Sequence, residues 1–265
     1  MENTIDFRLL FTSDVHGHLY PIDYVTEKES HFSMANVATA IEKLSEGRKN
    51  VVILDLGDIL QGNPMMEYHF HREKHKTNPA AICLNNIGYD YFVPGNHDFN
   101  YGRAYLSRFI SQIEAKPLCA NITDKKGNPA IGSPYDIITL APGLKIVVVG
   151  LITQYIPNWE KKANVRNLVF LDACEQARKM VASIKKTEDP ALQIVAYHGG
   201  FEKYLDTFLP YVEDTGENEG SRMLEQIDGI DILLSGHQHR RICQKVKNTW
   251  VIQPVPGRPE VKPTQ

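Results

Sequence analysis

The apolar residues of this 265-residue chain follow two kinds of pattern. Nearly unbroken apolar runs predict strands, and they occupy residues 7–12, 51–54, 146–149, 194–197 and 230–234. Between the runs, apolar residues recur at intervals of three and four, which predicts helices with one buried face. These helices lie near residues 34–44, 106–113 and 172–186. Because strands alternate with helices along the chain, we expect a layered α/β fold.

Shorter apolar segments predict further strands near residues 118–122, 135–140, 242–246 and 250–253. The run at 146–149 is apolar at every position, so we expect a central strand covered on both faces. The last residues, 254–265, contain four prolines and few apolar side chains. They predict a disordered or loosely attached tail after a single domain that spans residues 1–253.

Polar side chains follow four of the predicted strands and the short apolar run at residues 91–93. They are Asp14 with His16, Asp58, Asn96 with His97 and Asp98, His198, and His237 with His239. In α/β folds, ligands collect at the carboxyl ends of the strands. One such motif is usually only a polar turn, but five motifs at strand ends are strong evidence together.

Residues 93–102 contain the densest of these motifs. A Pro-Gly pair ends the preceding strand, because proline lacks a backbone donor and glycine tolerates unusual backbone angles. Asn96, His97 and Asp98 are therefore presented from a tight turn. The alternative interpretation of this stretch alone is a polar turn without chemistry.

The side chains at the strand ends combine carboxylate, amide and imidazole ligands. This mixture suits Mn²⁺, Fe or Zn²⁺ rather than Ca²⁺ or a structural zinc bound by thiolates. In an extended segment alternate side chains share one side, so Asp14 and His16 can reach one ion together, as can His237 and His239. Seven or eight ligands are too many for one ion, but they suffice for two ions that share a bridging carboxylate. Two ions about 3.5–4 Å apart are a known arrangement for phosphoryl chemistry.

Composition narrows the choice of partner. The chain is 42% hydrophobic and 23% charged with a net charge of −3, so neither a nucleic acid nor an anionic membrane is expected as its main partner. The four cysteines lie far apart, and the N-terminus shows no basic segment followed by an apolar one. Both features favour a cytoplasmic location. A secreted protein trimmed of its leader would show the same features.

Residues 68–76 mix charges with histidines, and we expect a solvated helical face there rather than a metal site.

In order along the chain, the motifs resemble the signature of the calcineurin-like metallophosphoesterases. They are Asp14-x-His16, Gly57-Asp58, Gly95-Asn96-His97-Asp98, His198 and Gly236-His237-x-His239. The resemblance covers nearly the whole chain and implies a four-layer α/β/β/α sandwich. Residues 57–64, 99–102 and 153–160 are similar to the branch of the 5′-nucleotidase group that hydrolyses 2′,3′-cyclic nucleotides and 3′-nucleotides.

The resemblance also implies a role for each motif residue. One ion would be held by Asp14, His16 and His239, and the other by Asn96, His198 and His237, with Asp58 bridging both. A metal-bridging hydroxide would attack phosphorus in line. Asn96 would help to stabilise the phosphoryl oxygens, and His97 would stabilise or protonate the departing ribose oxygen.

This chain departs from the related 5′-nucleotidases at Asn100, where they carry an Asp that orients the catalytic histidine. An amide can orient the His97 ring but cannot offset its positive charge, and this departure favours the cyclic-phosphodiesterase branch. Asp98 is the nearest substitute carboxylate, although bracing of its own turn is the favoured role. His18 and Asn121 are further candidates for contact with the substrate or its phosphate. For His18 a role in the turn is favoured, and for Asn121 a structural role is at least equally compatible.

The leading hypothesis is therefore a two-metal enzyme that hydrolyses small nucleotides, most simply 2′,3′-cyclic or 3′-phosphorylated ones. A 5′-nucleotidase or a general phosphodiesterase is the alternative within the same chemistry. A catalytically silent module that binds metal or a nucleotide is the alternative from another class. Relatives continue into a C-terminal domain that grips the base, and we expect this domain to be absent from the chain.

Overall fold

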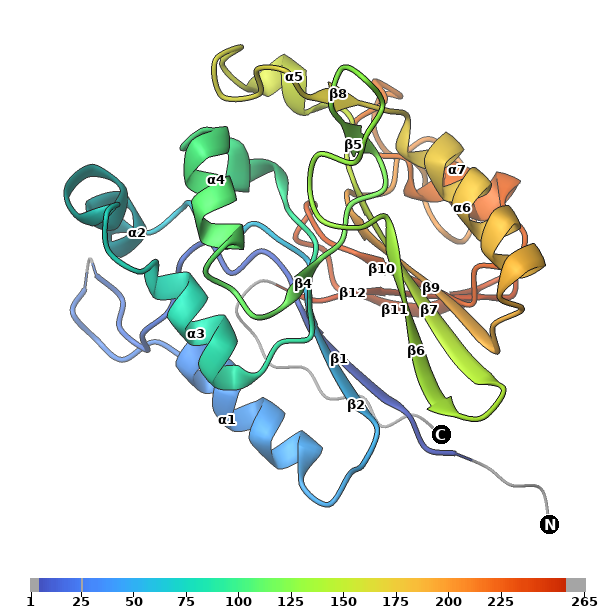
Figure 1. Ribbon diagram of the computed structural model, residues 1–265, viewed down its shortest axis with the longest axis horizontal. Helices are drawn as coiled ribbons and strands as arrows, with labels where there is room; N and C mark the ends of the chain where they lie inside the picture. Colours follow the sequence, from blue (N-terminus) through green and yellow to red (C-terminus); the bar gives the residue numbers. More distant parts are fainter. Residues whose placement is uncertain (1–4, 25, 256–265) are drawn as a thin grey trace.

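The computed structural model describes residues 5–24 and 26–255, and it shows two main β-sheets that face each other between two layers of helices (Figure 1). The first sheet is parallel throughout, in the order β1-β2-β3-β4. Its strands are β1 (Arg8–Thr12), β2 (Val51–Asp55), β3 (Tyr91–Phe92) and β4 (Lys116–Pro117).

The second sheet has the order β11-β12-β10-β9-β7-β6. The four inner strands run parallel to one another, and the two edge strands β6 and β11 run antiparallel to their neighbours. The strands are β6 (Tyr135–Ala141), β7 (Leu144–Ile152), β9 (Leu192–His198), β10 (Ile232–Ser235), β11 (Ile242–Val246) and β12 (Thr249–Gln253). A separate antiparallel pair consists of β5 (Ile122–Thr123) and β8 (Val169–Phe170).

Helices cover the outer faces of both sheets, as their amphipathic patterns require. Helices α1 (Met34–Ser45), α3 (Pro79–Ile87) and α4 (Arg103–Ile110) lie on the first sheet, and α6 (Ala173–Thr187) and α7 (Gly220–Gln226) lie on the second (Figure 1). Side-chain caps begin several of them: Ser33 accepts from the Asn36 amide of α1, and Asp172 accepts from the Glu175 amide of α6. The shorter segments are α2 (Pro64–Tyr68), a π-helical turn (His69–Glu73), a 3₁₀ turn (Asn96–Phe99) and α5 (Ile156–Trp159).

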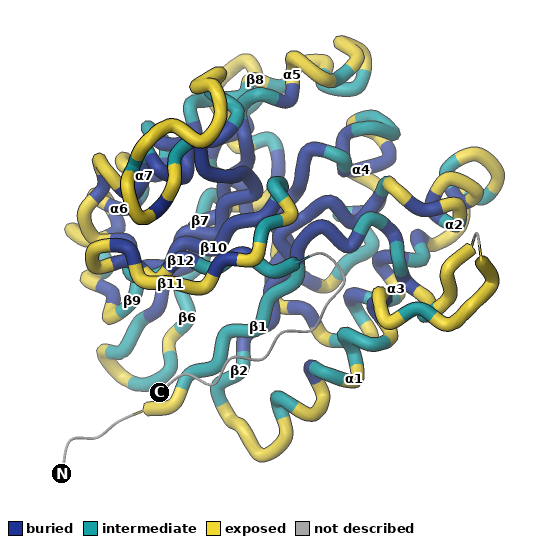
Figure 2. Tube along the Cα trace, turned by 180° about the vertical axis from the view of Figure 1, so that it is seen from behind, coloured by how far each residue is buried: buried dark blue, intermediate teal, exposed yellow. Residues whose placement is uncertain are grey.

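A third hydrophobic core fills the space between the two sheets. Leu54, Val148 and Ile194 are completely buried there, while the alternate β7 residues Val147 and Val149 face the α6 side. Strand β7 is thus covered on both faces, which confirms the prediction made from its unbroken apolar run. The buried strands run through the interior in Figure 2, and the exposed residues gather on helices and loops. The predicted four-layer α/β/β/α sandwich is confirmed.

One local prediction was wrong, and another was wrong for a single residue. Residues 118–121 do not form a strand, because this segment crosses between the sheets: the Leu118 amide donates to Phe92 O of the first sheet and the Ala120 amide to Gly150 O of the second. Most of residues 68–76 are exposed, as predicted, but His69 is not solvated. It is buried, and its Nδ1 lies 2.7 Å from the Tyr105 hydroxyl.

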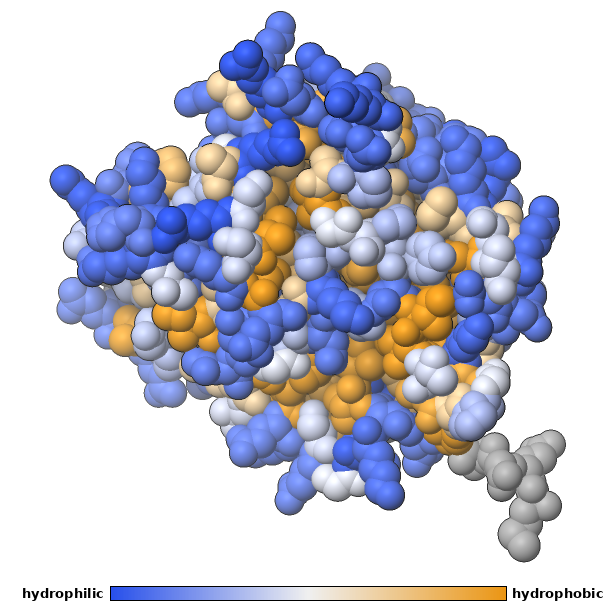
Figure 3. Space-filling model, viewed as in Figure 1, coloured by the Kyte–Doolittle hydropathy of each residue, from blue (hydrophilic) through white to orange (hydrophobic). Residues whose placement is uncertain are grey.

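The face of the molecule seen in Figure 3 carries mostly hydrophilic residues at its periphery, with hydrophobic residues grouped between them. Within residues 5–24 and 26–255, no helix combines the length and apolarity needed to cross a membrane. The predicted tail at 254–265 falls outside the described residues from 256 onward.

Candidate dinuclear metal centre

The loops that follow β1, β2, β3, β9 and β10 meet at the carboxyl ends of the two sheets. Direct backbone hydrogen bonds join the loops after β1 and β2: the Asp14 amide donates to Gly57 O at 2.9 Å, and the His16 amide donates to Asp58 O at 2.7 Å. The loop after β3 approaches the loop after β2 equally closely. Only glycine fits at position 95, because a Cβ there would lie 2.2 Å from Asp58 Oδ1.

Five predicted metal ligands share an unusual backbone conformation. Their φ angles are positive, between 50° and 68°, a region that residues with a side chain seldom occupy. These residues are Asp14, His16, Asp58, His237 and His239. Such strain persists only where the surrounding structure enforces it, and it concentrates at functional sites. The backbone itself therefore marks these loops as a site.

The first cluster of ligand atoms consists of Asp14, His16 and His239. His239 Nε2 lies 3.2 Å from His16 Nε2 and 3.3 Å from Asp14 Oδ1. The other ring nitrogen of His16, Nδ1, lies 3.0 Å from the Gln61 carbonyl and must donate to it, so the neutral ring directs an Nε2 lone pair into the cluster. Asp14 is buried, whereas His239 is 46% exposed, so this cluster opens to solvent.

The second cluster consists of Asp14, Asp58 and His198, all of them buried. His198 Nε2 lies 3.3 Å from Asp58 Oδ2 and 3.2 Å from Asn96 Oδ1. His198 Nδ1 hydrogen-bonds the Leu56 carbonyl, so Nε2 is again the nitrogen left for a ligand. Asp14 belongs to both clusters, and the assignment of the bridging role to Asp58 stays a prediction.

These donors fit divalent cations. Both clusters bring lone pairs of carboxylate and imidazole groups close together, and the second adds the amide oxygen of Asn96; such an arrangement is repulsive unless positive charge lies among the lone pairs. The pKa of a buried histidine reflects the same need for positive charge. Burial would lower the pKa of His198, but the Asp58 carboxylate outweighs burial and raises it to about 10. Asp14, Asp58, Asn96 and the three histidines His16, His198 and His239 are thus suited to hold two ions, whose identities the donors do not specify.

His237 lies at the rim of the second cluster, with its ring centroid 5.8 Å from that of His198. Its backbone amide donates to both carboxylate oxygens of Asp14 at 3.1 Å. Its Nε2 lies 2.9 Å from Glu217 Oε1, which leaves Nδ1 as the nitrogen available to an ion. Glu217 lies in a loop without a strand end or a motif, and sequence reasoning did not find it.

His97 stands beside the first cluster, and its ring centroid lies 5.3 Å from that of His16. The His97 backbone amide donates to Asp58 Oδ1 at 2.7 Å, which ties this residue to the ligand loop. On the far side of the ring, Nδ1 lies 2.7 Å from Asn100 Oδ1. The structure therefore brings the predicted pair His97 and Asn100 together.

Asp98 is completely buried. Its carboxylate accepts the backbone amides of Gly95, Asp58, Ile59 and Leu60 at 2.8–3.0 Å. These bonds clamp the loop after β2 to the loop after β3, so the carboxylate braces the site and does not contact His97.

The two candidate substrate residues have other partners. His18 Nδ1 lies 3.0 Å from Val15 O, which agrees with the role in the turn. Asn121 is completely buried; its Nδ2 donates to Ile152 O and Leu171 O, and its Oδ1 accepts the Ile152 amide. A contact between Asn121 and substrate does not fit this structure, because these three bonds use both ends of its amide.

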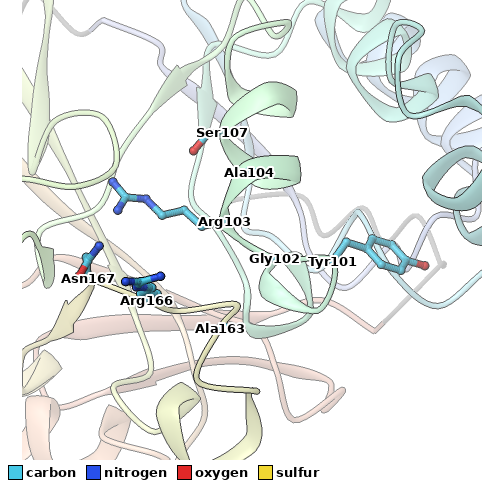
Figure 4. Close-up of a pocket in the computed structure, with 8 residues that line it drawn as sticks. All are labelled: Tyr101, Gly102, Arg103, Ala104, Ser107, Ala163, Arg166 and Asn167. Atoms are coloured by element: carbon cyan, nitrogen blue, oxygen red, sulfur yellow. The ribbon is translucent and has the colours of Figure 1, made fainter.

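A cavity of about 450 Å³ lies beside the loop that carries Asn100 (Figure 4). In the close-up the side chain of Arg103 extends from α4 toward Arg166 and Asn167, whereas Tyr101 points away from them. This cavity is separate from the metal clusters.

A four-layer sandwich with carboxylates and imidazoles at its strand ends is the architecture of a metallophosphoesterase. The family model described as calcineurin-like phosphoesterase matches residues 7–241, and the chain belongs to this family.

Among its relatives is the 2′,3′-cyclic-nucleotide 2′-phosphodiesterase/3′-nucleotidase of Haemophilus influenzae, 30% identical over 92% of this chain and 38% of the relative. The 5′-nucleotidase of Vibrio vulnificus is 27% identical over 93% of this chain and 42% of its own length. The crystal structure of a candidate 5′-nucleotidase from Staphylococcus aureus superposes with a TM-score of 0.85 at 32% identity, covering 93% of this chain and 48% of that one. The chain thus spans about two fifths of the length of these two curated relatives.

Proposed function

We propose that this chain catalyses the metal-dependent hydrolysis of nucleotide phosphoesters, with 2′,3′-cyclic nucleotides and 3′-nucleotides as the preferred substrates. One observation carries the proposal. Two clusters of ligand atoms share Asp14, and the ring of His97 lies directly beside them, 5.3 Å from that of His16.

The chain's own residues would divide the work between binding and proton transfer. The carboxylates, Asn96 and the histidines would bind two divalent ions, which supply positive charge for the phosphoryl oxygens and lower the pKa of a water molecule. Asn96 would also donate its amide N–H to a phosphoryl oxygen. His97, outside both clusters, would give a proton to the departing oxygen.

Two features support a nucleotide as substrate. Trp159 is 43% exposed and its ring centroid lies 5.5 Å from that of His237, so an aromatic face borders the site and could stack on a base. The names of two relatives, a 2′,3′-cyclic-nucleotide 2′-phosphodiesterase/3′-nucleotidase and a 5′-nucleotidase, also favour a nucleotide substrate. Asn100 favours the cyclic substrate on the argument from the sequence.

Replacement of Asp58 tests the metal-dependent chemistry. Asp58→Asn keeps the shape of a buried ligand but removes its charge, so hydrolysis of bis-p-nitrophenyl phosphate by the metal-loaded protein should fall at least 100-fold. Asp228→Asn is the matched control, because Asp228 is exposed and precedes β10 at the opposite end of the sheet. Unchanged hydrolysis by Asp58→Asn would refute the proposed chemistry.

A panel of 2′,3′-cAMP, 3′-AMP and 5′-AMP tests the substrate. We expect turnover of the first two to exceed that of 5′-AMP. A clear preference for 5′-AMP would favour the 5′-nucleotidase instead. Two tightly bound ions without turnover of any of the three would favour a silent binding module.

A further inference from the structure

We infer that Glu160 is a positioning residue for His97, acting through the amide of Asn100; this inference rests on the proposed function. Asn100 and Glu160 lie 60 positions apart in the sequence. The structure joins them in one chain of hydrogen bonds that ends on the imidazole.

The chain of hydrogen bonds begins at His97 Nδ1, 2.7 Å from Asn100 Oδ1. Asn100 Nδ2 in turn donates to Glu160 Oε1. The other carboxylate oxygen of Glu160, Oε2, accepts from Asn164 Nδ2 at 2.7 Å. The same Nδ2 also donates to the backbone carbonyl of Asn100 at 3.0 Å. Glu160 immediately follows α5 and is half-buried, so its carboxylate is held from two sides.

This arrangement decides which end of the Asn100 amide faces His97. A carboxylate offers only acceptors, so it selects the NH₂ end of the amide and turns the carbonyl oxygen toward the imidazole. The ring must then carry a hydrogen on Nδ1, and Nε2 remains for the substrate. Without Glu160 the amide could rotate by half a turn and favour the opposite tautomer.

The chemical consequence concerns the leaving oxygen. When the P–O bond breaks, its electron pair stays on the departing ribose oxygen, which takes the proton from Nε2 of the imidazolium. The neutral ring that results carries its remaining proton on Nδ1, and this is the tautomer that Asn100 accepts from. Glu160 also places a negative charge one amide beyond the ring, which supplies through Asn100 part of the charge that a direct carboxylate would supply.

Glu160→Gln breaks this arrangement without changing its size. The Gln amide has one acceptor end, yet donors from Asn100 and Asn164 approach it from both sides, so at least one bond is lost. We expect turnover of 3′-AMP, whose ribose leaving group needs a proton, to fall about tenfold to 100-fold. Turnover of p-nitrophenyl phosphate, whose leaving group needs none, should change less than about threefold.

The double variant Asn100→Asp with Glu160→Gln should recover most of the 3′-AMP turnover. In it a carboxylate accepts directly from His97 Nδ1, and the Gln amide donates to that carboxylate. Glu188→Gln is the matched control, because Glu188 is also partly buried and pairs with Lys145, away from the site. Loss of both activities in Glu160→Gln together with a lowered melting temperature would show a merely structural role and overturn the inference.

A second measurement does not depend on turnover. In ¹⁵N spectra of the metal-free protein, the neutral form of the His97 ring should carry its proton on Nδ1. In Glu160→Gln the Nε2–H tautomer should gain population. An unchanged tautomer with an unchanged ratio of the two turnovers would overturn the inference. If the wild-type protein turned over neither substrate, the proposed function would fail, and the tautomer would still decide the role of Glu160.

Discussion

Glu217 orients His237, which the sequence predicts as a metal ligand without indicating which ring nitrogen binds. Replacement of Glu217 tests this orienting role. Glu217 Oε1 lies 2.9 Å from His237 Nε2, and this hydrogen bond holds the pKa of Glu217 below its usual range. The carboxylate thereby keeps the hydrogen on Nε2 and leaves Nδ1 for an ion. Glu217→Ala should therefore weaken metal binding without removing any ligand.

The expected size of the effect follows from the geometry. Loss of a residue that orients a metal-bound histidine typically lowers metal affinity about 10- to 100-fold, or about 1.4–2.8 kcal/mol. Because the Glu217 side chain is 32% exposed, solvent replaces part of the interaction and the lower end applies, about tenfold. Glu217→Gln keeps an acceptor oxygen but loses the charge, so its effect should be about threefold.

Competition with a chromophoric chelator measures the affinity of each bound equivalent separately. We expect one Zn²⁺ or Mn²⁺ equivalent to weaken and the other to keep its wild-type affinity. Glu213→Gln is the control, because it removes a charge from an exposed residue of the same loop. Wild-type affinity for both equivalents in Glu217→Ala would refute the orienting role.

Three further predictions concern pH, substrate and backbone. Burial raises the pKa of Asp55 to about 8, so the folded chain keeps a proton that the unfolded chain releases near pH 4, and stability falls as pH rises between these values. Asp55→Asn should flatten that fall in melting temperature, and a profile parallel to wild type would contradict it. Trp159→Ala should raise KM for nucleotides about tenfold and leave p-nitrophenyl phosphate unaffected; equal effects on both substrates would argue against stacking. Gly95→Ala would place a Cβ 2.4 Å from the Asp58 amide nitrogen, so thermal unfolding should show a loss of about 1–3 kcal/mol together with less bound metal, and an unaltered melting temperature would be the contrary result.

Much of the fold could be predicted because its signals are local. The unbroken run of β7 and the spacing of α6 reflect burial that each segment needs wherever it packs, so the pattern predicted a layered α/β fold, whereas the number and order of the layers came from the family resemblance. The segment 118–121 was misread because its apolar residues serve two sheets in turn. His69 was misread because a histidine looks polar in sequence, whereas here it lies in the interior with its Nδ1 paired to the Tyr105 hydroxyl.

The sequence by itself determined the chemistry at the strand ends, since Asp14, Asp58 and His198 follow apolar runs whose ends must meet in an α/β fold. Only the tertiary structure decided how those groups are aimed. Glu217 and Glu160 lie in loops without periodicity, and hydrogen bonds across long separations carry no signal in a single sequence. A ligand's identity is a property of its residue, but its orientation is a property of its neighbours in space.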